Sequence, residues 1–501
     1  MITQNDVIYF ILTDRFCDGD TKNNQGVDKA HPSRYHGGDF GGIAKKIPYL
    51  KNLGVTCLWV TPVYLSIGRC GDSDGYHGYW ALDFEKVDPH LYSKDPSLAE
   101  GSKEYLKKLV NKLHQAKIKV VLDMVVNHTG YHNDTYHSYS DKKIKDSWFN
   151  PPRSNGDEVK SALSGLPDLN HDLAEVVDYF VNNILDWIEE TAIDAIRMDT
   201  VKHVEPAFWY FFKSYIRGKY RNITLLGEDL EYDVYRISEY QKAHDFDTLF
   251  DFPLCSVMKE VFIYHGPMTR LARPRLSDNE PKGILDMDKD YTNANRLVTL
   301  LDNHDLDKRF MTEILDKVGH WDRNLALEIF KTVLTFLFTT RGIPQIYYGT
   351  ELGMEGRKDP DNRQDMPWEK FARGLEPKEG SEKEIFNHLR SLIKIRKENE
   401  AIPYGYLFTL YVDTFIYAYI REFRGNTIIV AINNGLKEMV YSCSIPIEVN
   451  TNIPPRLKEA LKKRRVLDNL LDPNDSIEYE NGRIQVKLGR KEARIYKLRL
   501  K

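Results

Sequence analysis

Short apolar runs alternate with amphipathic stretches over the first 350 residues of the chain. Eight of these runs have the Val, Ile, Leu and aromatic content of buried strands. They lie at residues 7–12, 55–60, 120–126, 195–198, 224–226, 248–252, 298–301 and 343–348. Most intervening stretches repeat apolar residues at helical spacing, as at Val176, Phe180, Ile184 and Trp187.

Eight strands alternating with helices predict an α/β fold of the (β/α)8 TIM-barrel type. An open doubly wound sheet is the alternative reading of the same alternation. No G-x-G-x-x-G motif follows the first run, so the sequence does not favour a nucleotide-binding version of that sheet.

Two stretches depart from the alternation. Residues 129–171 are rich in His, Asn, Asp, Ser, Pro and Gly and are too long for an ordinary loop, so we expect a small inserted domain after strand three. Beyond residue 402 short alternating runs at 407–419, 427–433, 439–445 and 484–498 predict a C-terminal all-β sandwich. The predicted domains are barrel segments 1–128 and 172–402, an insert at 129–171 and a sandwich at 403–501.

Composition excludes several classes of protein. The 501 residues are 42% hydrophobic and 29% charged, which is typical of a large folded chain and not of a disordered one. Because 70 Lys and Arg nearly balance 74 Asp and Glu, there is no basic field to bind nucleic acid or an anionic membrane.

The cysteines and the N-terminal residues indicate in which cellular compartment the protein is expected. Five scattered cysteines without C-x-x-C spacing indicate reduced thiols. No basic segment precedes the first apolar run, and no run approaches the roughly 18 apolar residues of a membrane span. We expect a cytoplasmic protein, or a secreted one if a signal peptide has been removed; the oligomeric state stays open.

Polar residues follow four of the predicted strands directly, at residues 123–128, 197–203, 227–229 and 302–305. The loops at this end of a TIM barrel build its active site. A single Asp after a strand is more often a helix N-cap, but four such clusters predict a catalytic site. Arg197 and Asp199 are two residues apart on a strand and share a face, where the cation can keep the carboxylate ionised. A structural ion pair is the alternative.

These four clusters resemble the four sequence regions of the α-amylase family, glycoside hydrolase family thirteen. Residues 166–170 (LPDLN) resemble the family's fifth region, and residues 75–80 (GYHGYW) its sugar-stacking loop. Residues 342–344 and 359–363 resemble its last strand and the loop that follows. The resemblance covers the whole chain.

The resemblance implies that Asp199 is the nucleophile, Glu228 the general acid/base and Asp305 the transition-state stabiliser. Cleavage of an acetal needs a protonated acid for the leaving oxygen and an anion facing the oxocarbenium carbon. The remaining substrate-binding residues implied by the resemblance are His77, Tyr79, His128, Arg197, Lys202, His203, His304, Asp359 and Arg363. Tyr79 as a core aromatic and Arg363 as a solvated loop cation are the alternatives.

The resemblance also implies Ca²⁺ at two sites. The first would bind Asn127, Asp168 and the His203 carbonyl, with a carbonyl near Val159 as a looser candidate, and would join the barrel to the insert. The second would be formed by Asp18, Asp20, Asn23, Asn24, Gly37 and Asp39. Oxygen ligands from distant segments suit a hard cation, although clustered Asp, Asn and Gly are also ordinary turn residues.

Departures from the family pattern bear on the reaction. Asp229 and Leu230 follow Glu228 where relatives usually carry an aromatic residue, and Ser164 stands where cyclising relatives place one. Ala195 and Ile196 replace a Gly-Phe or Gly-Ile pair, and no starch-binding domains follow the sandwich.

Because aromatic residues on the acceptor side favour a sugar over water, these departures favour hydrolysis. We predict a retaining α-1,4-glucan endo-hydrolase (α-amylase) that acts on starch or maltodextrins through a covalent glycosyl-enzyme. A 4-α-glucanotransferase, or a cyclodextrin-forming or cyclodextrin-cleaving enzyme, is the alternative. A non-catalytic glucan-binding protein would lack one of the three carboxylates, and all three are present.

Overall fold

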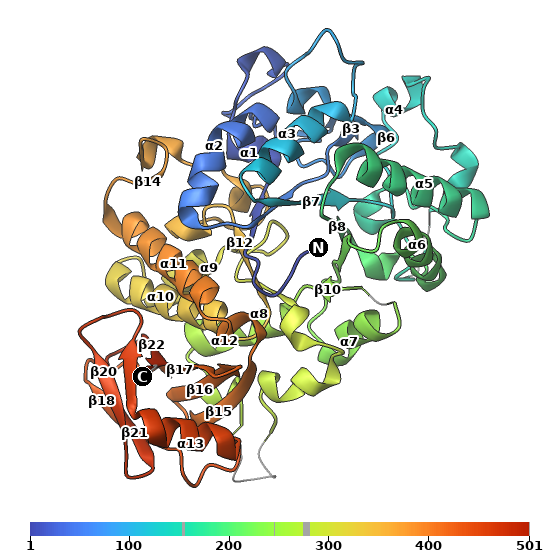
Figure 1. Cartoon of the computed structure of the whole chain (residues 1–501). Coiled ribbons are helices and arrows are strands. Elements are labelled where there is room, and N and C mark those ends of the chain that lie inside the picture. Colours follow the sequence, from blue (N-terminus) through green and yellow to red (C-terminus); the bar gives the residue numbers. More distant parts are fainter. Residues whose placement is uncertain (153–155, 245, 274–280, 500–501) are drawn as a thin grey trace.

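The computed structural model describes residues 1–152, 156–244, 246–273 and 281–499. Within these ranges, eight parallel strands form the central sheet (Figure 1). They are β1 (Ile8–Ile11), β2 (Cys57–Val60), β7 (Lys119–Met124), β8 (Ala195–Met198), β9 (Thr224–Gly227), β10 (Thr248–Leu249), β11 (Val298–Thr299) and β12 (Ile343–Tyr347). Each lies within, or shifted by one residue from, a run predicted from the sequence.

The sheet closes on itself. Its order is β10-β9-β8-β7-β2-β1-β12-β11, and a parallel bridge between Phe250 and Val298 joins the two ends. The fold is therefore the predicted (β/α)8 barrel. Strands β10 and β11 are shorter than their apolar runs because buried residues beyond them, such as Phe252 and Leu301, leave the ladder while still packing in the core.

Helices cover the outside of the barrel. They are α1 (Thr13–Phe16), α2 (Phe40–Leu53), α3 (Glu104–Gln115), α5 (Ala174–Thr191), α6 (Pro206–Lys219), α7 (Val234–Lys242), α8 (Phe252–Met258), α9 (Phe310–Val318), α10 (Arg323–Thr339), α11 (Gly380–Glu398) and α12 (Ala401–Tyr404). Helix α5 buries the apolar stripe predicted from its spacing, Val176, Phe180, Ile184 and Trp187. No helix in the described ranges combines the length and hydropathy needed to cross a membrane.

Two excursions rise from the barrel. Between β2 and α3 the chain forms β3 (Tyr64–Ser66), β4 (Arg69–Cys70), β5 (Ser73–Asp74) and β6 (Ala81–Val87), which the sequence did not predict. Between β7 and α5 lies the expected insert, with the short helix α4 (Asp134–Ser138). A bridge from His128 to Asp168 connects the insert to the end of β7, and a bridge from Phe149 to Leu169 joins two segments within the insert.

The C-terminal part is a β domain packed against α10 and α12 (Figure 1). In the described residues its antiparallel order is β15-β16-β17-β22-β19-β20-β21-β18. The strands are β15 (Tyr406–Val412), β16 (Ile416–Phe423), β17 (Asn426–Asn433), β18 (Tyr441–Pro446), β19 (Val466–Asn469), β20 (Ser476–Glu480), β21 (Arg483–Leu488) and β22 (Glu492–Leu498).

The predicted run 407–419 splits into the hairpin β15–β16, and the run 484–498 splits into β21 and β22, which pair with other strands; β19 and β20 were missed. Helix α13 (Pro455–Arg464) was also missed, because only Leu457 and Leu461 on it are buried. A small strand pair, β13 (Phe371–Ala372) and β14 (Glu376–Pro377), precedes α11.

Candidate active site

The register of the barrel places two acidic residues side by side. Met198 of β8 pairs with Gly227 of β9, so the next residues, Asp199 and Glu228, emerge together at the C-terminal mouth. The Glu228 backbone N–H donates to the Met198 carbonyl over 2.9 Å. Adjacent parallel strands thus bring the predicted nucleophile and acid together although they are 29 positions apart in the sequence.

Arg197 lies fully buried beneath these two carboxyls. Its NH1 is 2.5 Å from Asp199 Oδ1 and 2.9 Å from Asp123 Oδ1, and its NH2 is 3.7 Å from Glu228 Oε2. One planar guanidinium therefore contacts all three acids. Removing a charge from this unexposed position would leave the others uncompensated, so the cluster acts as one electrostatic unit.

Asp123 belongs to one of the four polar clusters, but the sequence assigned it no role. It pairs in register with Arg197 and accepts hydrogen bonds from Trp59 Nε1 (3.0 Å) and the Tyr79 hydroxyl (2.8 Å). Asp123 therefore holds Arg197 and the Tyr79 ring in place. An ionisable residue inside an otherwise apolar strand is the signal that could have revealed it.

The environment of Glu228 favours its protonated form. Burial, together with the charges of Asp199 and Asp305, raises its pKa to about 8 against the opposing effects of Arg197 and the Thr200 N–H. That N–H donates to Glu228 Oε2 over 2.9 Å from a left-handed turn (φ 47°). A carboxyl that is protonated at neutral pH can donate a proton to a leaving oxygen.

Asp305 stands on the opposite wall with the other loop residues. Its side chain is 34% exposed, and its oxygens lie 3.4 Å from His304 Nε2 and 3.4 Å from Arg363 NH2. Arg363 NH1 is also 3.2 Å from Asp359 Oδ2. Arg363 is thus an ordered, buried cation that joins two acids, and the alternative of a solvated loop cation is wrong.

The Gly75–Trp80 loop delivers aromatic faces to the same site. A Cβ at Gly78 (φ +86°) would lie 2.1 Å from the Pro62 carbonyl oxygen, so this turn requires glycine. The turn lets the Tyr79 ring stack on His304 with centroids 5.3 Å apart. Burial and nearby cations lower the pKa of His77 and of His304 well below the usual histidine value, so both rings are neutral hydrogen-bonding groups.

A cleft of about 490 Å³ opens above these residues. It brings together all the predicted catalytic and substrate-binding residues except Arg197, which lies beneath it: His77, Tyr79, His128, Asp199, Lys202, His203, Glu228, His304, Asp305, Asp359 and Arg363. Burial lowers the pKa of His128. The cleft wall also includes residues without a predicted role: Trp80, Tyr131, Leu163, Leu166 and Thr200.

Tyr131 changes the interpretation of Ser164. The Tyr131 hydroxyl donates to the Ser164 carbonyl over 3.0 Å, and its ring packs edge-on against Trp80 at 5.2 Å. The sequence indicated that no aromatic residue occupies position 164. In the fold, an aromatic ring from the other end of the insert lies beside that position.

Lys202 is tied to the cleft wall. Its Nζ donates to the Leu230 carbonyl over 3.0 Å and lies 3.6 Å from Glu158 Oε1. His203 Nδ1–H donates to the Glu158 carbonyl over 2.7 Å. Leu230 lines the cleft and packs partly against the core.

The residues predicted for the first cation site meet where the insert joins β7. Leu169 N–H donates to the Asn127 carbonyl, and Asn150 Nδ2 donates to Asp168 Oδ2 over 2.8 Å. In the described part of the chain, Asn127 Oδ1 and Asp168 Oδ1 are buried without a hydrogen-bond partner. Burial raises the pKa of Asp168 to about 7. Two unsatisfied oxygens of this kind fit a hard cation.

Glu205 and His171 extend this cluster. Both side chains are buried, and His171 Nδ1 lies 3.3 Å from Glu205 Oε2. The Glu205 charge raises the pKa of Asp168. No local motif marks these two residues: His171 is three positions after Asp168, and Glu205 directly precedes α6.

The second predicted cluster is built from two loops. A bridge from Asp18 to Gly38 joins them, and Asn24 Nδ2 donates to Asp18 Oδ2 over 2.8 Å. Among the described residues, the buried Oδ1 atoms of Asp18, Asn23 and Asn24 lack partners. A Cβ at Gly37 would lie 2.6 Å from Asn24 Oδ1, so glycine leaves that oxygen accessible.

Two members of the second cluster are used differently from the prediction. Asp39 accepts N–H donors from Gly19, Asp20 and Gly42 and from Asn23 Nδ2, which occupy its carboxylate and make it the N-cap of α2. Asp20 caps the turn at Lys22 with a largely solvated carboxyl. Asp39 and Asp20 thus have capping roles in this structure, and their predicted roles at a cation site stay predictions.

No group of three or more His, Cys, Asp or Glu side chains converges as a metal site within the described ranges. Both predicted cation clusters depend on Asn and backbone oxygens, which such a grouping does not include. The fit of the two clusters to a cation rests on their unpartnered oxygens.

Residues 10–405 match the family described as alpha amylase, catalytic domain. The chain belongs to the α-amylase family of glycoside hydrolases. The Beta/alpha-amylase of Paenibacillus polymyxa is 33% identical over 98% of this chain, which spans only 37% of that protein. The solved α-amylase from Anoxybacillus superposes with a TM-score of 0.82 at 31% identity, covering 100% of this chain and 99% of that one.

A third relative in the α-amylase family corrects one argument about the reaction. A cyclomaltodextrin glucanotransferase with a three-domain arrangement has a TM-score of 0.78 and 25% identity, with 99% of each chain covered. A domain arrangement like that of this chain therefore occurs in a cyclising enzyme as well as in an α-amylase, so the arrangement does not distinguish the two reactions.

Proposed function

We propose that this protein is a retaining endo-acting α-1,4-glucan hydrolase that cleaves starch or maltodextrins through a covalent glycosyl-enzyme. The observation that carries the proposal is the single buried guanidinium of Arg197 between Asp199 and Glu228. It contacts the Asp199 carboxyl at 2.5 Å, while burial raises the pKa of Glu228 to about 8. One carboxylate and one carboxylic acid at neutral pH are what this reaction requires.

In the first step, Glu228 donates its proton to the glycosidic oxygen as the bond from that oxygen to the anomeric carbon breaks. Asp199 Oδ then bonds to the anomeric carbon, with Asp305 facing the positive charge that develops there. In the second step, the Glu228 carboxylate takes a proton from water, whose oxygen displaces Asp199. The sugar leaves with a new reducing end, and both acids return to their initial state.

The choice of water as acceptor rests on Leu230 and Ser164, which supply no ring at two positions of the cleft wall. Tyr131 beside Ser164 supports the alternative of glycosyl transfer, because its ring offers an apolar face to an acceptor sugar. We keep hydrolysis as the principal function because Leu230 follows the acid Glu228 by two positions and is therefore nearer to it in the chain than Ser164 is.

We infer that Ca²⁺ binds at both clusters of unpartnered oxygens. Asn127 and Asp168 would hold one ion with the His203 carbonyl, and Asp18, Asn23 and Asn24 would hold the other. When bound, the ion would compensate buried negative charge at the base of the insert and stiffen it beside the cleft. We also infer a cytoplasmic location, which the five unpaired thiols support.

Product analysis tests the proposed function. The enzyme is incubated with maltoheptaose, cyclodextrins or pullulan, and products are separated by chromatography while reducing ends are counted. We expect shorter linear maltodextrins and a steady rise in reducing ends from maltoheptaose. Products longer than maltoheptaose, or cyclic products, as the main species would replace the hydrolase proposal with the transferase alternative.

A further inference from the structure

We propose that Trp321 and the pocket beside it form a second α-glucan-binding site, on the outside of the barrel and separate from the catalytic cleft. The ligand class rests on the proposed function, since the glucan is the substrate proposed above. The site would hold a long substrate chain by an internal segment without cleaving it.

Trp321 is the first observation. Its side chain is 88% exposed, the highest fraction among the large hydrophobic residues that the structure describes. An indole this exposed has its ring accessible to a ligand with an apolar face. The residue lies in the turn between α9 and α10.

The backbone under the indole is shaped to hold it flat. Gly319 has a φ of +91°, and a Cβ there would lie 2.4 Å from the Trp321 ring. The ring therefore rests directly on the glycine backbone and turns its other face to solvent. A fixed, flat aromatic face matches the apolar C–H face of a pyranose ring and costs little conformational entropy on binding.

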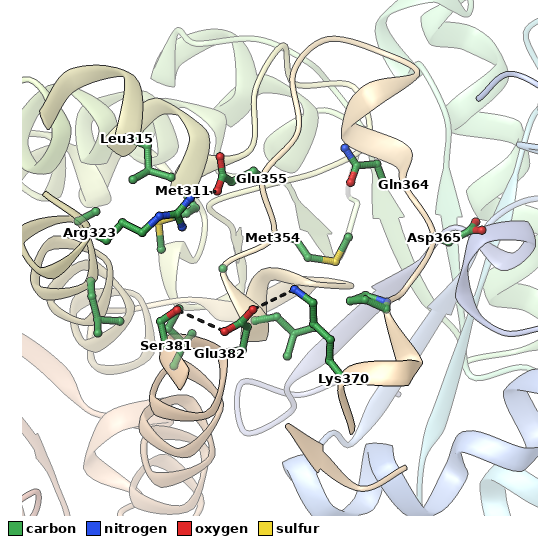
Figure 2. Close-up of a pocket in the computed structure, with 16 residues that line it drawn as sticks. Met311, Leu315, Arg323, Met354, Glu355, Gln364, Asp365, Lys370, Ser381 and Glu382 are labelled. Carbon is green, nitrogen blue, oxygen red and sulfur yellow. Dashed lines mark hydrogen bonds and ion pairs between the residues drawn. The ribbon is translucent and has the colours of Figure 1, made fainter. Parts of the chain in front are cut away.

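The pocket is the second observation. It has a volume of about 340 Å³ and lies between α9, α10, the start of α11 and the segment 352–370 (Figure 2). His320 and Arg323, on either side of Trp321, both approach Glu355 in the pocket wall, at 4.0 and 3.2 Å. Because Trp321 lies between these two residues in the chain, we infer that it flanks the pocket without being part of its lining.

The charges in the pocket select a neutral ligand. Arg323 pairs with Glu355, and Lys370 pairs with Glu382 at 3.0 Å, so each lining cation is matched by an acid. In Figure 2, Ser381, Glu382 and Lys370 form a hydrogen-bonded row along one edge. An anion would have to displace an acid from its partner, whereas hydroxyl groups can bond to both partners of each pair.

The floor of the pocket is apolar, and its members come from four elements: Met311, Leu315, Leu352, Met354 and Ile385. An apolar floor with a rim of paired polar groups suits a ligand that has hydroxyls at its edges and C–H groups on its faces. A glucan chain has both. The volume falls in the range of about 300–1,000 Å³ typical of small-ligand sites.

One segment of chain builds part of both sites. Residues 352–370 supply Asp359 and Arg363 to the catalytic cleft and Gln364, Asp365 and Lys370 to this pocket. The two sites therefore lie on opposite sides of a single loop. A chain bound at Trp321 would be held close to the cleft, which raises the effective concentration of neighbouring glucan segments there.

The experiment measures adsorption to insoluble starch by the Asp199→Asn protein, which binds without degrading the starch. Adding Trp321→Ala should weaken adsorption at least fivefold, and Trp321→Phe should retain part of it. The matched control is Tyr210→Ala, which removes a 72% exposed aromatic residue on α6 and should leave adsorption unchanged. Melting temperatures check that each variant folds.

In the otherwise wild-type enzyme, Trp321→Ala should lower the rate on starch granules but leave kcat/KM for maltotriose within twofold. Unchanged starch adsorption by Trp321→Ala, or an equal loss in Tyr210→Ala, would overturn the second site. A parallel loss on maltotriose would also overturn it, because Trp321 would then act on the cleft. Adsorption through Trp321 without any glucan cleavage by the wild type would overturn only the catalytic proposal.

Discussion

The catalytic centre and the two predicted cation clusters are both crowded with buried oxygens, but they neutralise charge differently. At the catalytic centre Arg197 contacts Asp123, Asp199 and Glu228. In the clusters, by contrast, the described residues leave Oδ1 of Asn127 and of Asp168 unpartnered.

This difference predicts that the Arg197 cluster governs turnover, whereas the cation clusters govern the stability of the fold. A protein cation built into a strand gives a fixed geometry, in which Arg197 contacts three acids at once. An unpartnered oxygen in a cation cluster gains a partner only when an ion binds, so its contribution to stability depends on the ion concentration. Damage to the first should abolish turnover in a folded protein; damage to the second should reduce stability first.

Asp199→Asn should have the largest effect. The amide is nearly isosteric but cannot form the glycosyl-enzyme, so turnover of maltodextrin should fall below detection while the melting temperature stays close to that of the wild type. Steady-state kinetics on maltoheptaose, with circular dichroism of the same preparation, checks this. A kcat similar to that of the wild type would contradict the assignment of Asp199.

Glu228→Gln should lower kcat on maltoheptaose by about 10²–10⁴-fold, the usual contribution of a general acid. Glycosyl-enzyme formation from an α-glucosyl fluoride should be reduced much less, because fluoride leaves without protonation. Equal losses on both substrates would mean that Glu228 is not the acid.

The pKa of Glu228 also sets the sign of the pH dependence. Its raised pKa of about 8 means that the acid is protonated below that pH, so kcat/KM should fall as the pH rises through about 8. Glu228→Gln should remove this basic limb. The neighbouring Glu231→Gln, whose carboxylate pairs with Arg236 at 3.1 Å, should keep it.

Removal of Ca²⁺ by a chelator should lower the stability of the protein without moving the catalytic carboxyls. A site filled at a hundredfold excess over Kd contributes about 2.7 kcal/mol, so excess EDTA should lower the melting temperature by several degrees. Asp168→Ala and Asn24→Ala should each reduce the EDTA effect. The control Asn133→Ala removes the α4 cap in the same insert and should leave the EDTA effect intact.

An unchanged melting temperature in EDTA, together with no calcium by elemental analysis, would remove both cation sites. The unpartnered oxygens would then be satisfied by water alone.

The smallest expected effect lies at the edge of the catalytic centre. Leu230→Phe should raise the ratio of transfer to hydrolysis from maltoheptaose a few-fold, about 1 kcal/mol in partitioning, because the ring would stack on an acceptor sugar and exclude water. Chromatography of products at fixed substrate concentration measures this ratio. Tyr131→Ala is the matched test, because loss of this ring should lower the ratio of transfer to hydrolysis.

If Leu230→Phe only lowers the melting temperature, the larger ring is overpacked and does not face the acceptor. If neither substitution changes the ratio, the choice between water and sugar is made elsewhere in the cleft.

Local patterns predicted most of the barrel because strand-length apolar runs and helical spacing are properties of adjacent residues. The run at Ala195–Met198 is identical to β8, and the clusters that follow the strands meet in one cleft. The prediction failed where tertiary contacts stabilise weak local signals, as in helix α13 and in the excursion that contains β3 and β6. Those elements depend on partners distant in the chain.

The amino-acid sequence by itself determined the barrel, the C-terminal β domain, the three acids and the family, because each is encoded by residue type and short-range spacing. Only the tertiary structure decided that Asp123 supports Arg197, that Tyr131 lies beside Ser164 and that Asp39 caps a helix. Each of these facts is a choice among hydrogen-bond partners that register and packing bring within about 3 Å. Residue identity names the possible donors and acceptors, but the fold alone selects which of them meet and which oxygens stay free for an ion.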